Sequence, residues 1–134
     1  MLISSYEISI NTKEKFEIID ITSQINELLD IDEGIVNIFS KHSTSAIVVN
    51  ENEKGLLKDS KNSLNNLITN QNNYYHDKID NNASSHLKSF LLSPSETLPV
   101  KNSRLDLGTW QSVFFVELDG PRKQRIINLK VIGK

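Results

Sequence analysis

Residues 40–52 read SKHSTSAIVVNEN, a β-branched run with polar residues at both of its ends. The run Ala46–Val49 is typical of a β-strand, because branched side chains fit a pleated and half-buried surface. A strand that only filled a core would not need His42 before it, or the amide, carboxylate and amide of Asn50–Asn52 after it. The pattern therefore indicates a strand whose two ends have a role beyond packing.

The sequence on either side predicts a mixture of strands and helices. Strand-like segments are residues 6–10, 16–21, 35–39, 46–49, 97–100, 110–118 and 125–132. Apolar residues at helical spacing predict helices over 22–29, 53–69 and 86–92. We expect the first two strands to form one hairpin, and the last two to form another around the turn Asp119–Pro121. In the last helix, Leu87, Phe90 and Leu91 share one face.

Length and composition limit the class of protein. A chain of 134 residues is long enough to bury a core, so we expect a single domain over residues 1–134. The absence of cysteine excludes disulfides, thiolate nucleophiles and sulfur-ligated zinc. The balance of 15 basic and 17 acidic residues argues against a nucleic-acid partner. Without a signal-like leader or an apolar run of ~20 residues, we expect a cytoplasmic protein with no membrane partner.

Three histidines, His42, His76 and His86, lie beside polar residues rather than inside apolar runs. Neutral imidazole is the commonest metal ligand, and three of them with an open fourth position make a catalytic zinc site. Their spacing does not establish convergence, so surface or hydrogen-bonding histidines are the competing interpretation. Asp77 and Asp80 could orient an imidazole, supply oxygen ligands to magnesium, or simply form a solvated turn.

Other polar motifs each have a structural and a functional interpretation. The segment Asn50–Asn52 can cap a helix or orient a substrate or metal, and local evidence favours capping. Arg104 and Arg122 can bind a phosphate or carboxylate through two hydrogen bonds, or can be solvated surface residues. In Leu107–Gln111, LGTWQ, the glycine permits close approach of another backbone. The neighbouring Trp110 can pack in the core or cover an aromatic ligand, and the motif alone favours packing.

These motifs occur together in a fixed order along the chain. They are HSTSAIVVNEN at 42–52, YYHD at 74–77, ASSHLKSFLL at 83–92 and PSETLPVKNSRLDLGTWQSVFFVELDGPRKQRII at 94–127. In order and spelling they resemble the YjbQ-like family, which is described as a secondary thiamine-phosphate synthase. The resemblance extends from about residue 35 onward. Ser93 and Ser103 stand where the family often has glycine.

The resemblance implies an α+β domain, with a mainly antiparallel, sandwich-like β-sheet packed with a few helices, assembled as a homotrimer. It implies that the metal ligands are His42, His76 and His86. The catalytic residues that it suggests are Glu51, Lys88, Arg104 and Arg122. The substrate-binding residues that it suggests are Asn50, Asn52, Thr109, Trp110 and Gln111. Gly108 and Glu117 also match the motifs of the family.

The activity that the resemblance implies joins a phosphorylated thiazole alcohol to a pyrimidine methyl diphosphate and releases pyrophosphate. Charge grows on the diphosphate as it leaves, so Lys88, Arg104 and Arg122 are candidates to neutralise it, while Trp110 could stack on a heterocycle. Three histidines suit zinc and an activated water better than magnesium-bound diphosphate. A metal-dependent hydrolase and a non-catalytic trimeric metabolite-binding protein are therefore the alternatives. In each case we expect a small phosphorylated or anionic metabolite as partner. For the enzymes we expect a divalent metal, zinc if the histidines bind it and magnesium if the diphosphate chemistry holds.

Overall fold

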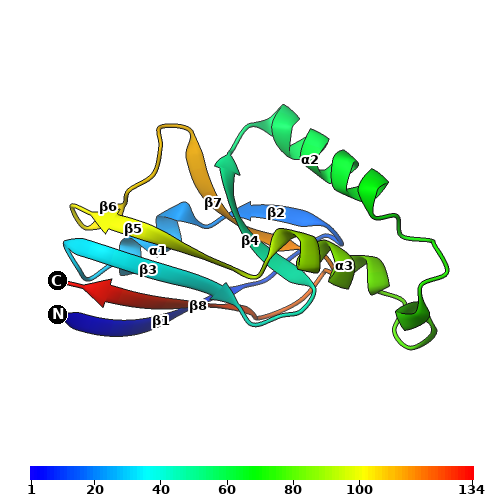
Figure 1. Ribbon diagram of the computed structural model, residues 1–134, viewed down its shortest axis with the longest axis horizontal. Helices are drawn as coiled ribbons and strands as arrows, with labels where there is room; N and C mark the ends of the chain where they lie inside the picture. Colours follow the sequence, from blue (N-terminus) through cyan, green and yellow to red (C-terminus); the bar gives the residue numbers. More distant parts are fainter.

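The computed structural model describes residues 1–134, which fold into two antiparallel sheets, three α-helices and one short 3-10 helix (Figure 1). In chain order the elements are β1 (Leu2–Ile10), β2 (Glu17–Asp20), α1 (Thr22–Leu28), β3 (Glu33–Ser40), β4 (Ser45–Glu51), α2 (Lys54–Leu67), η1 (Tyr75–Lys78), α3 (Ala83–Leu92), β5 (Ser95–Lys101), β6 (Arg104–Leu105), β7 (Gln111–Glu117) and β8 (Arg125–Gly133). The expected α+β class is confirmed. No helix is long and apolar enough to cross a bilayer.

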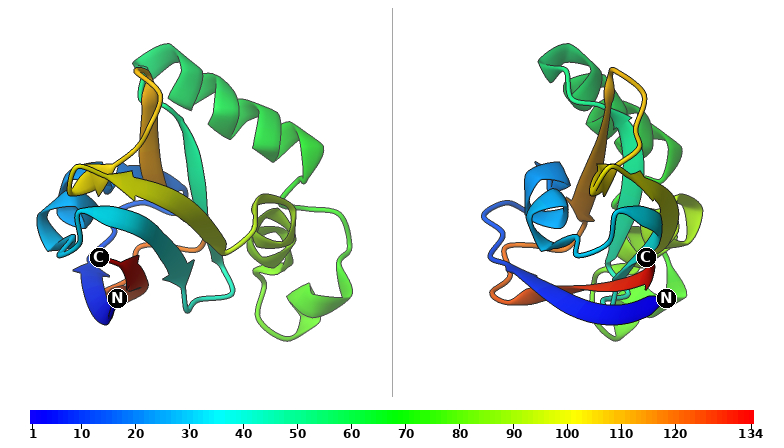
Figure 2. Two further views of the ribbon diagram at one scale, coloured as in Figure 1. Left: turned by 60° about the vertical axis from the view of Figure 1, so that its left-hand side comes forward. Right: turned by 90° about the vertical axis from the view of Figure 1, so that its left-hand side faces the viewer.

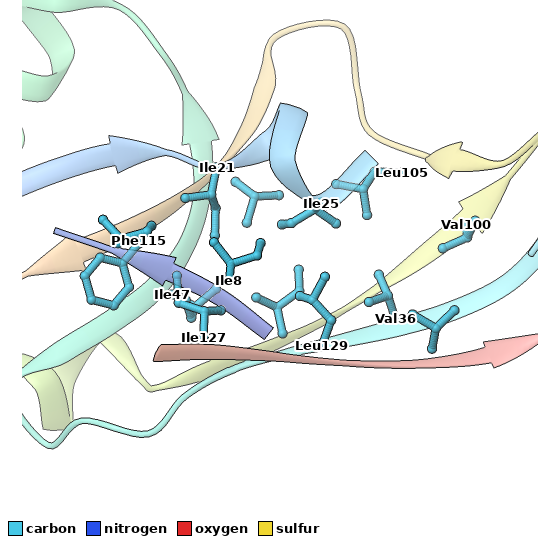
Figure 3. Packing of buried hydrophobic residues seen from close by; sticks show 14 of the residues in the cluster. Ile8, Ile21, Ile25, Val36, Ile47, Val100, Leu105, Phe115, Ile127 and Leu129 are labelled. Carbon is cyan, nitrogen blue, oxygen red and sulfur yellow. The ribbon is translucent and has the colours of Figure 1, made fainter. Parts of the chain in front are cut away.

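The two sheets enclose one main hydrophobic core. The five-stranded sheet has the order β1-β8-β3-β5-β6, and the three-stranded sheet has the order β2-β7-β4. Ile47 and Phe115 reach into the core from the smaller sheet, and Ile127 and Leu129 reach into it from β8 (Figure 3). Ile25 of α1 is fully buried beside them. Helix α2 lies on the side away from β1 and β8, whereas α3 lies beside β4 (Figures 1 and 2).

Both predicted hairpins are wrong, because the strands in each pair belong to different sheets. Strand β1 pairs with β8, whereas β2 pairs with β7. The turn Asp119–Pro121 therefore leads from one sheet to the other. A Cβ on Gly120 would lie 2.1 Å from the carbonyl oxygen of Glu14, so the turn packs tightly against the β1–β2 connection. Only β5 and β6 are consecutive strands that pair with each other.

Helix α3 places its polar side against the protein and its apolar side outward. Its buried residues are Ala83, Ser84, Ser85, Lys88 and Ser89. The hydroxyl of Ser85 donates to the carbonyl oxygen of Leu118 at 2.6 Å, and the hydroxyl of Ser89 donates to that of Ser45 at 2.6 Å. The face predicted from sequence, Leu87 with Phe90 and Leu91, exists but is exposed. These serine bonds fix the orientation in which α3 presents His86.

Candidate functional site

One hollow of about 440 Å³ contains two of the three histidines, and we call it the histidine hollow. It lies where the end of β3, the β3–β4 connection, α3 and the α3–β5 connection meet. Its polar lining residues are Ser40, Lys41, His42, Ser43, His86, Ser89 and Ser93. No carboxylate lines it. A larger hollow over residues 70–81 is lined by Asp77 but by none of the predicted histidine, catalytic or substrate residues.

His42 is held in one tautomer by the backbone of β8. The amide of Ile126 donates to Nε2 of His42 at 2.8 Å, so the proton of the neutral ring is on Nδ1. Burial, followed by the charge of Arg125, lowers the pKa of His42 below its ordinary value of 6.5. His42 is therefore neutral at pH 7, and its Nδ1–H is available to donate to a ligand.

We expect an NMR titration of His42 to give a midpoint below 6.5. The unfolded chain then protonates this residue at a higher pH than the folded protein does. The free energy of unfolding therefore falls as the pH is lowered from about 6.5 toward the folded pKa. Urea unfolding of His42→Gln over the same pH range should show a smaller slope, because the glutamine oxygen can accept from Ile126 without titrating. A midpoint at or above 6.5 would contradict the assignment.

His76 and His86 lie together. Their ring centroids are 4.8 Å apart with an interplanar angle of 85°. The Nε2 atom of His76 is buried and has no hydrogen-bond partner. The nearby carboxylate of Asp77 accepts from the amide of Ala83 at 3.0 Å, so it caps the start of α3. The structure thus brings together the histidines of the second and third motifs.

The histidines do not form a complete metal site within one chain. No group of three or more histidine or acidic side chains is placed to hold a metal ion. The Nε2 lone pair of His42 already accepts from Ile126, and coordination through Nδ1 would need the proton moved onto the occupied Nε2. His42 therefore does not fit its predicted role as a metal ligand. A single chain offers the pair His76 and His86.

A buried ion pair lies behind the wall that carries His42. Glu117 and Arg125 are 0% and 5% exposed. Glu117 accepts from Nε of Arg125 at 2.9 Å and from the hydroxyl of Thr12 at 2.7 Å, and Arg125 also donates to Thr44 at 2.9 Å. Burial acts to raise the pKa of Glu117, but the bonds from Arg125 and Thr12 outweigh it and lower the pKa. Glu117 therefore has a structural role, because it neutralises Arg125 next to the site.

Asp119 organises the cations at this end of the molecule. It forms ion pairs with Lys15 and, at 3.0 Å, with Arg122, and it accepts from Asn82 at 2.8 Å. Although burial acts to raise its pKa, the bonds from Lys15 and Asn82 lower it, so Asp119 is charged. Arg122 keeps Nη1 free of protein partners, and its charge contributes to the lowered pKa of His42. The sequence indicates Asp119 only as a turn residue, because Lys15 and Asn82 are far from it in the chain.

Two other predicted catalytic cations lie away from the histidine hollow. Lys88 is buried, donates to Asn65 at 2.7 Å and lies over the ring of Phe16. Burial, followed by the charge of Lys15, lowers its pKa. Arg104 lies opposite Lys101 in the backbone pairing of β6 with β5, at the end of β5 that is farther from the hollow. Neither residue lines the hollow, because Lys88 faces α2 and a whole strand separates Arg104 from it.

Ser93, in the wall of the hollow, has an unusual backbone. Its φ of 80° and ψ of 145° lie in a region that is almost restricted to glycine and costs other residues about 1–3 kcal/mol. Ser93→Gly should therefore raise the free energy of unfolding by about 1 kcal/mol, measured by urea denaturation. Ser103, with a φ of 62°, is in the more tolerant left-handed region, so Ser103→Gly should change stability by less than about 0.5 kcal/mol. A loss of stability in Ser93→Gly would contradict this account.

A second cluster, which we call the Glu51 end, holds the predicted catalytic residue Glu51 together with four predicted substrate residues: Asn50, Asn52, Trp110 and Gln111. Glu51 at the end of β4 pairs with Gln111 at the start of β7. Gln111 accepts from the amide of Gly108 at 2.9 Å, and this bond closes the loop that contains Thr109. Trp110 is 73% exposed, so the core-packing interpretation is wrong.

The capping interpretation of Asn50–Asn52 is also wrong. Glu53 caps α2, since its carboxylate accepts from the amides of Gly55 and Leu56. Asn52 instead donates to Asp20 at 3.0 Å. Burial acts to raise the pKa of Asp20, but the bonds from Thr22 and Asn52 lower it, so this carboxylate is charged. Sequence reasoning missed Asp20, because its partner lies in a distant segment.

The Glu51 end and the histidine hollow lie at opposite ends of β4 (Figure 1). The strand runs from Ser45 to Glu51, which at ~3.3 Å per residue separates its ends by roughly 20 Å. One chain therefore does not bring Asn50, Asn52, Thr109, Trp110 and Gln111 to the histidines. Within one chain, the predicted site residues therefore lie in two separate polar clusters.

Comparison with known proteins places this fold and these motifs in one family. A family model described as UPF0047 protein YjbQ-like matches residues 6–134. A UPF0047 protein of Methanothermobacter thermautotrophicus is 49% identical over 100% of this chain and 95% of its own length. UPF0047 protein YugU of Bacillus subtilis is 33% identical over 94% of this chain and 97% of its own length.

Solved structures agree with the sequence comparison. The crystal structure of a YbjQ-like protein of unknown function from Sulfolobus solfataricus has a TM-score of 0.96 at 38% identity, and the match covers 99% of each chain. A hypothetical protein from Aeropyrum pernix has a TM-score of 0.90 at 33% identity over 100% of each chain. The expected relationship is confirmed, and the chain belongs to the UPF0047 family of YjbQ-like proteins.

Proposed function

We propose that the protein is a small-molecule enzyme that binds a phosphorylated metabolite in the histidine hollow. The main support is the lining, which combines two imidazoles, Lys41 and the hydroxyls of Ser43 and Ser93 with no carboxylate, while the hydroxyls of Ser40 and Ser89 bond within the protein. Such a lining favours an anion, because donors and a cation face it without a competing negative charge. The neutral, oriented His42 supplies a directed Nδ1–H donor.

As the reaction, we propose thiamine-phosphate synthesis, as a main or a side activity. The thiazole nitrogen attacks the methylene carbon of the pyrimidine substrate, the carbon–oxygen bond to the diphosphate breaks, and its electron pair leaves with the pyrophosphate. Negative charge grows on the leaving group, so nearby donors accelerate the step. Lys41 and Nη1 of Arg122 are the cations suited to this role, and His42 can donate to a phosphate oxygen.

Pyrophosphate release from the two substrates tests this function. Arg122→Ala should lower kcat about 10²-fold, the effect of losing one donor to developing charge. Lys123→Ala is the matched control, since its ammonium is a neighbouring cation that makes no ion pair or hydrogen bond. Wild-type protein that releases no pyrophosphate, or equal loss in both variants, would refute the proposal.

A second candidate function is metal-dependent hydrolysis, and the environment of the His76 ring supports it. The buried Nε2 of His76 has no hydrogen-bond partner in the protein and the ring lies beside that of His86, an arrangement that two imidazole ligands of one metal ion would have. A divalent metal, zinc by its preference for imidazole, would need further ligands from water, substrate or another subunit. Metal analysis should find an ion that is lost in His76→Ala. Equal metal content in wild type and variant would rule out this candidate.

We also propose that the chains assemble as a homotrimer, as the resemblance of the motifs implied. Large apolar side chains exposed on the single chain support assembly, among them Phe90, Tyr75 and Trp110. Light scattering measures the mass directly, and a mass equal to one chain of 15.2 kDa would refute assembly.

A further inference from the structure

We infer that the complete site forms between two copies of the chain, with the Glu51 end of one copy closing the histidine hollow of the next. The chemistry of this inference rests on the proposed function, but the contact itself does not. The motif residues are divided between the two clusters: the hollow holds two imidazoles and Lys41, while the Glu51 end holds a carboxylate without an ion-pair partner, amides and an exposed indole.

The apolar face of α3 is the first half of the contact. Leu87, Phe90 and Leu91 are 37%, 86% and 54% exposed, while the serines of the same helix are buried. A helix of a lone soluble domain normally has the opposite arrangement. Phe90 also lines the histidine hollow, so a protein that covers this face reaches the rim of the hollow.

Trp110 is the second half of the contact. Its ring is exposed at the end of a short loop that the bond between Gly108 and Gln111 holds in shape. Large aromatic anchors presented on an ordered element are typical of interface centres. Trp110 directly precedes Gln111, the cross-strand partner of Glu51, so docking of this indole carries the carboxylate with it.

The charges of the two clusters are complementary. Lys41 lines the hollow, and Arg122, which does not line it and is paired with Asp119, lies close enough to His42 for its charge to lower the pKa of that ring. The Glu51 end carries Glu51, which forms no ion pair, and the charged Asp20. Opposite potentials favour the contact between unlike ends over contact between like ends.

This contact is head-to-tail, because the two surfaces lie at opposite ends of β4. A head-to-tail contact closes into a ring when the rotation between copies permits it. Pairing of α3 with α3 would bury Phe90 but would leave Trp110 and Glu51 in solvent. The occupant of the α3 face is therefore a second copy presenting its Glu51 end.

Cysteine cross-linking tests the contact without reference to activity, because the chain has no native cysteine. Ser43, at the rim of the hollow, and Thr109, next to Trp110, are exposed positions whose replacement leaves Phe90 and Trp110 in place. Ser43→Cys chains mixed and reassembled with Thr109→Cys chains should form a covalent dimer with a short bifunctional maleimide, and neither variant should cross-link by itself. Leu67→Cys, at a site 69% exposed on α2, is the control partner for Ser43→Cys and should not cross-link. Self-linkage of Ser43→Cys, or no mixed linkage, would overturn the inference.

Subunit mixing tests the shared chemistry. His86→Ala and Glu51→Gln should each be inactive, and a reassembled equal mixture should recover up to about a quarter of wild-type pyrophosphate release, since heterologous sites draw on two chains. No recovery in cross-linked assemblies would overturn the composite site. If wild type itself releases no pyrophosphate, the proposed function fails, whereas the cross-linking result still decides the contact.

Discussion

Glu117→Gln should lower the free energy of unfolding by about 3–5 kcal/mol, because it leaves the buried guanidinium of Arg125 without a counter-charge. That is a large part of the total stability of ordinary domains, about 5–15 kcal/mol. Urea denaturation followed by circular dichroism measures it. Glu7→Gln is the control, since this exposed carboxylate of β1 forms no ion pair, and we expect a change within about 0.5 kcal/mol.

A double variant keeps this prediction testable if Glu117→Gln fails to fold. Glu117→Met with Arg125→Met removes both charges and fills a similar volume. The double variant should therefore lose less free energy of unfolding than the two single variants lose together. A double variant as unstable as that sum would show that the pair is not the cause.

The same pair predicts the response to acid. The pKa of Glu117 is lower in the folded protein than its ordinary value of 4.5. Its contribution is therefore present above pH 4.5 and is lost as the pH falls through the lower folded value, where the unfolded chain binds more protons. The stability of Glu117→Gln should depend less on pH in this range than that of wild type.

Phe115→Ala should cost about 3–5 kcal/mol, because it removes a fully buried ring from the core between the sheets (Figure 3). Phe90→Ala is the matched control, since it deletes the same atoms from a ring that is 86% exposed. Phe90→Ala should leave the chain folded, with native circular dichroism, and should weaken assembly measured by sedimentation. Similar thermal destabilisation of the two variants at a concentration where chains are separate would contradict the placement of these rings.

The local elements were readable from the sequence, whereas their partners were not. The alternation in Tyr6–Ile10 indicates one buried face, and it is the same whether the strand pairs with β2 or with β8. Pairing depends on segments far apart in the chain, so short-range turn signals such as Asp119–Pro121 were misleading. Helix α3 was predicted over residues 86–92 and begins three residues earlier, at Ala83. Ser85 and Ser89 face inward because they bond to backbone carbonyl oxygens of Leu118 and Ser45, which no helical pattern reveals.

The site was partly predictable for a similar reason. The motifs indicated His76 and His86, and the fold places them in contact. No pattern in the sequence indicates that a backbone amide of β8 donates to Nε2 of His42. The sequence also could not show that a full strand separates Glu51 from the imidazoles, since the two are neighbours in the motif HSTSAIVVNEN.

The pairing of β1 with β8 has a consequence for biosynthesis. Ile10 meets Arg125, so the first strand has no partner until nearly all of the intervening chain has left the ribosome. Proteins dominated by such distant pairings reach the native state slowly, within ms to s. The backbone N–H and C=O groups of residues 2–10 therefore stay unpaired through most of synthesis, which makes this segment prone to aggregation. Chaperone binding at residues 2–10 would shield it.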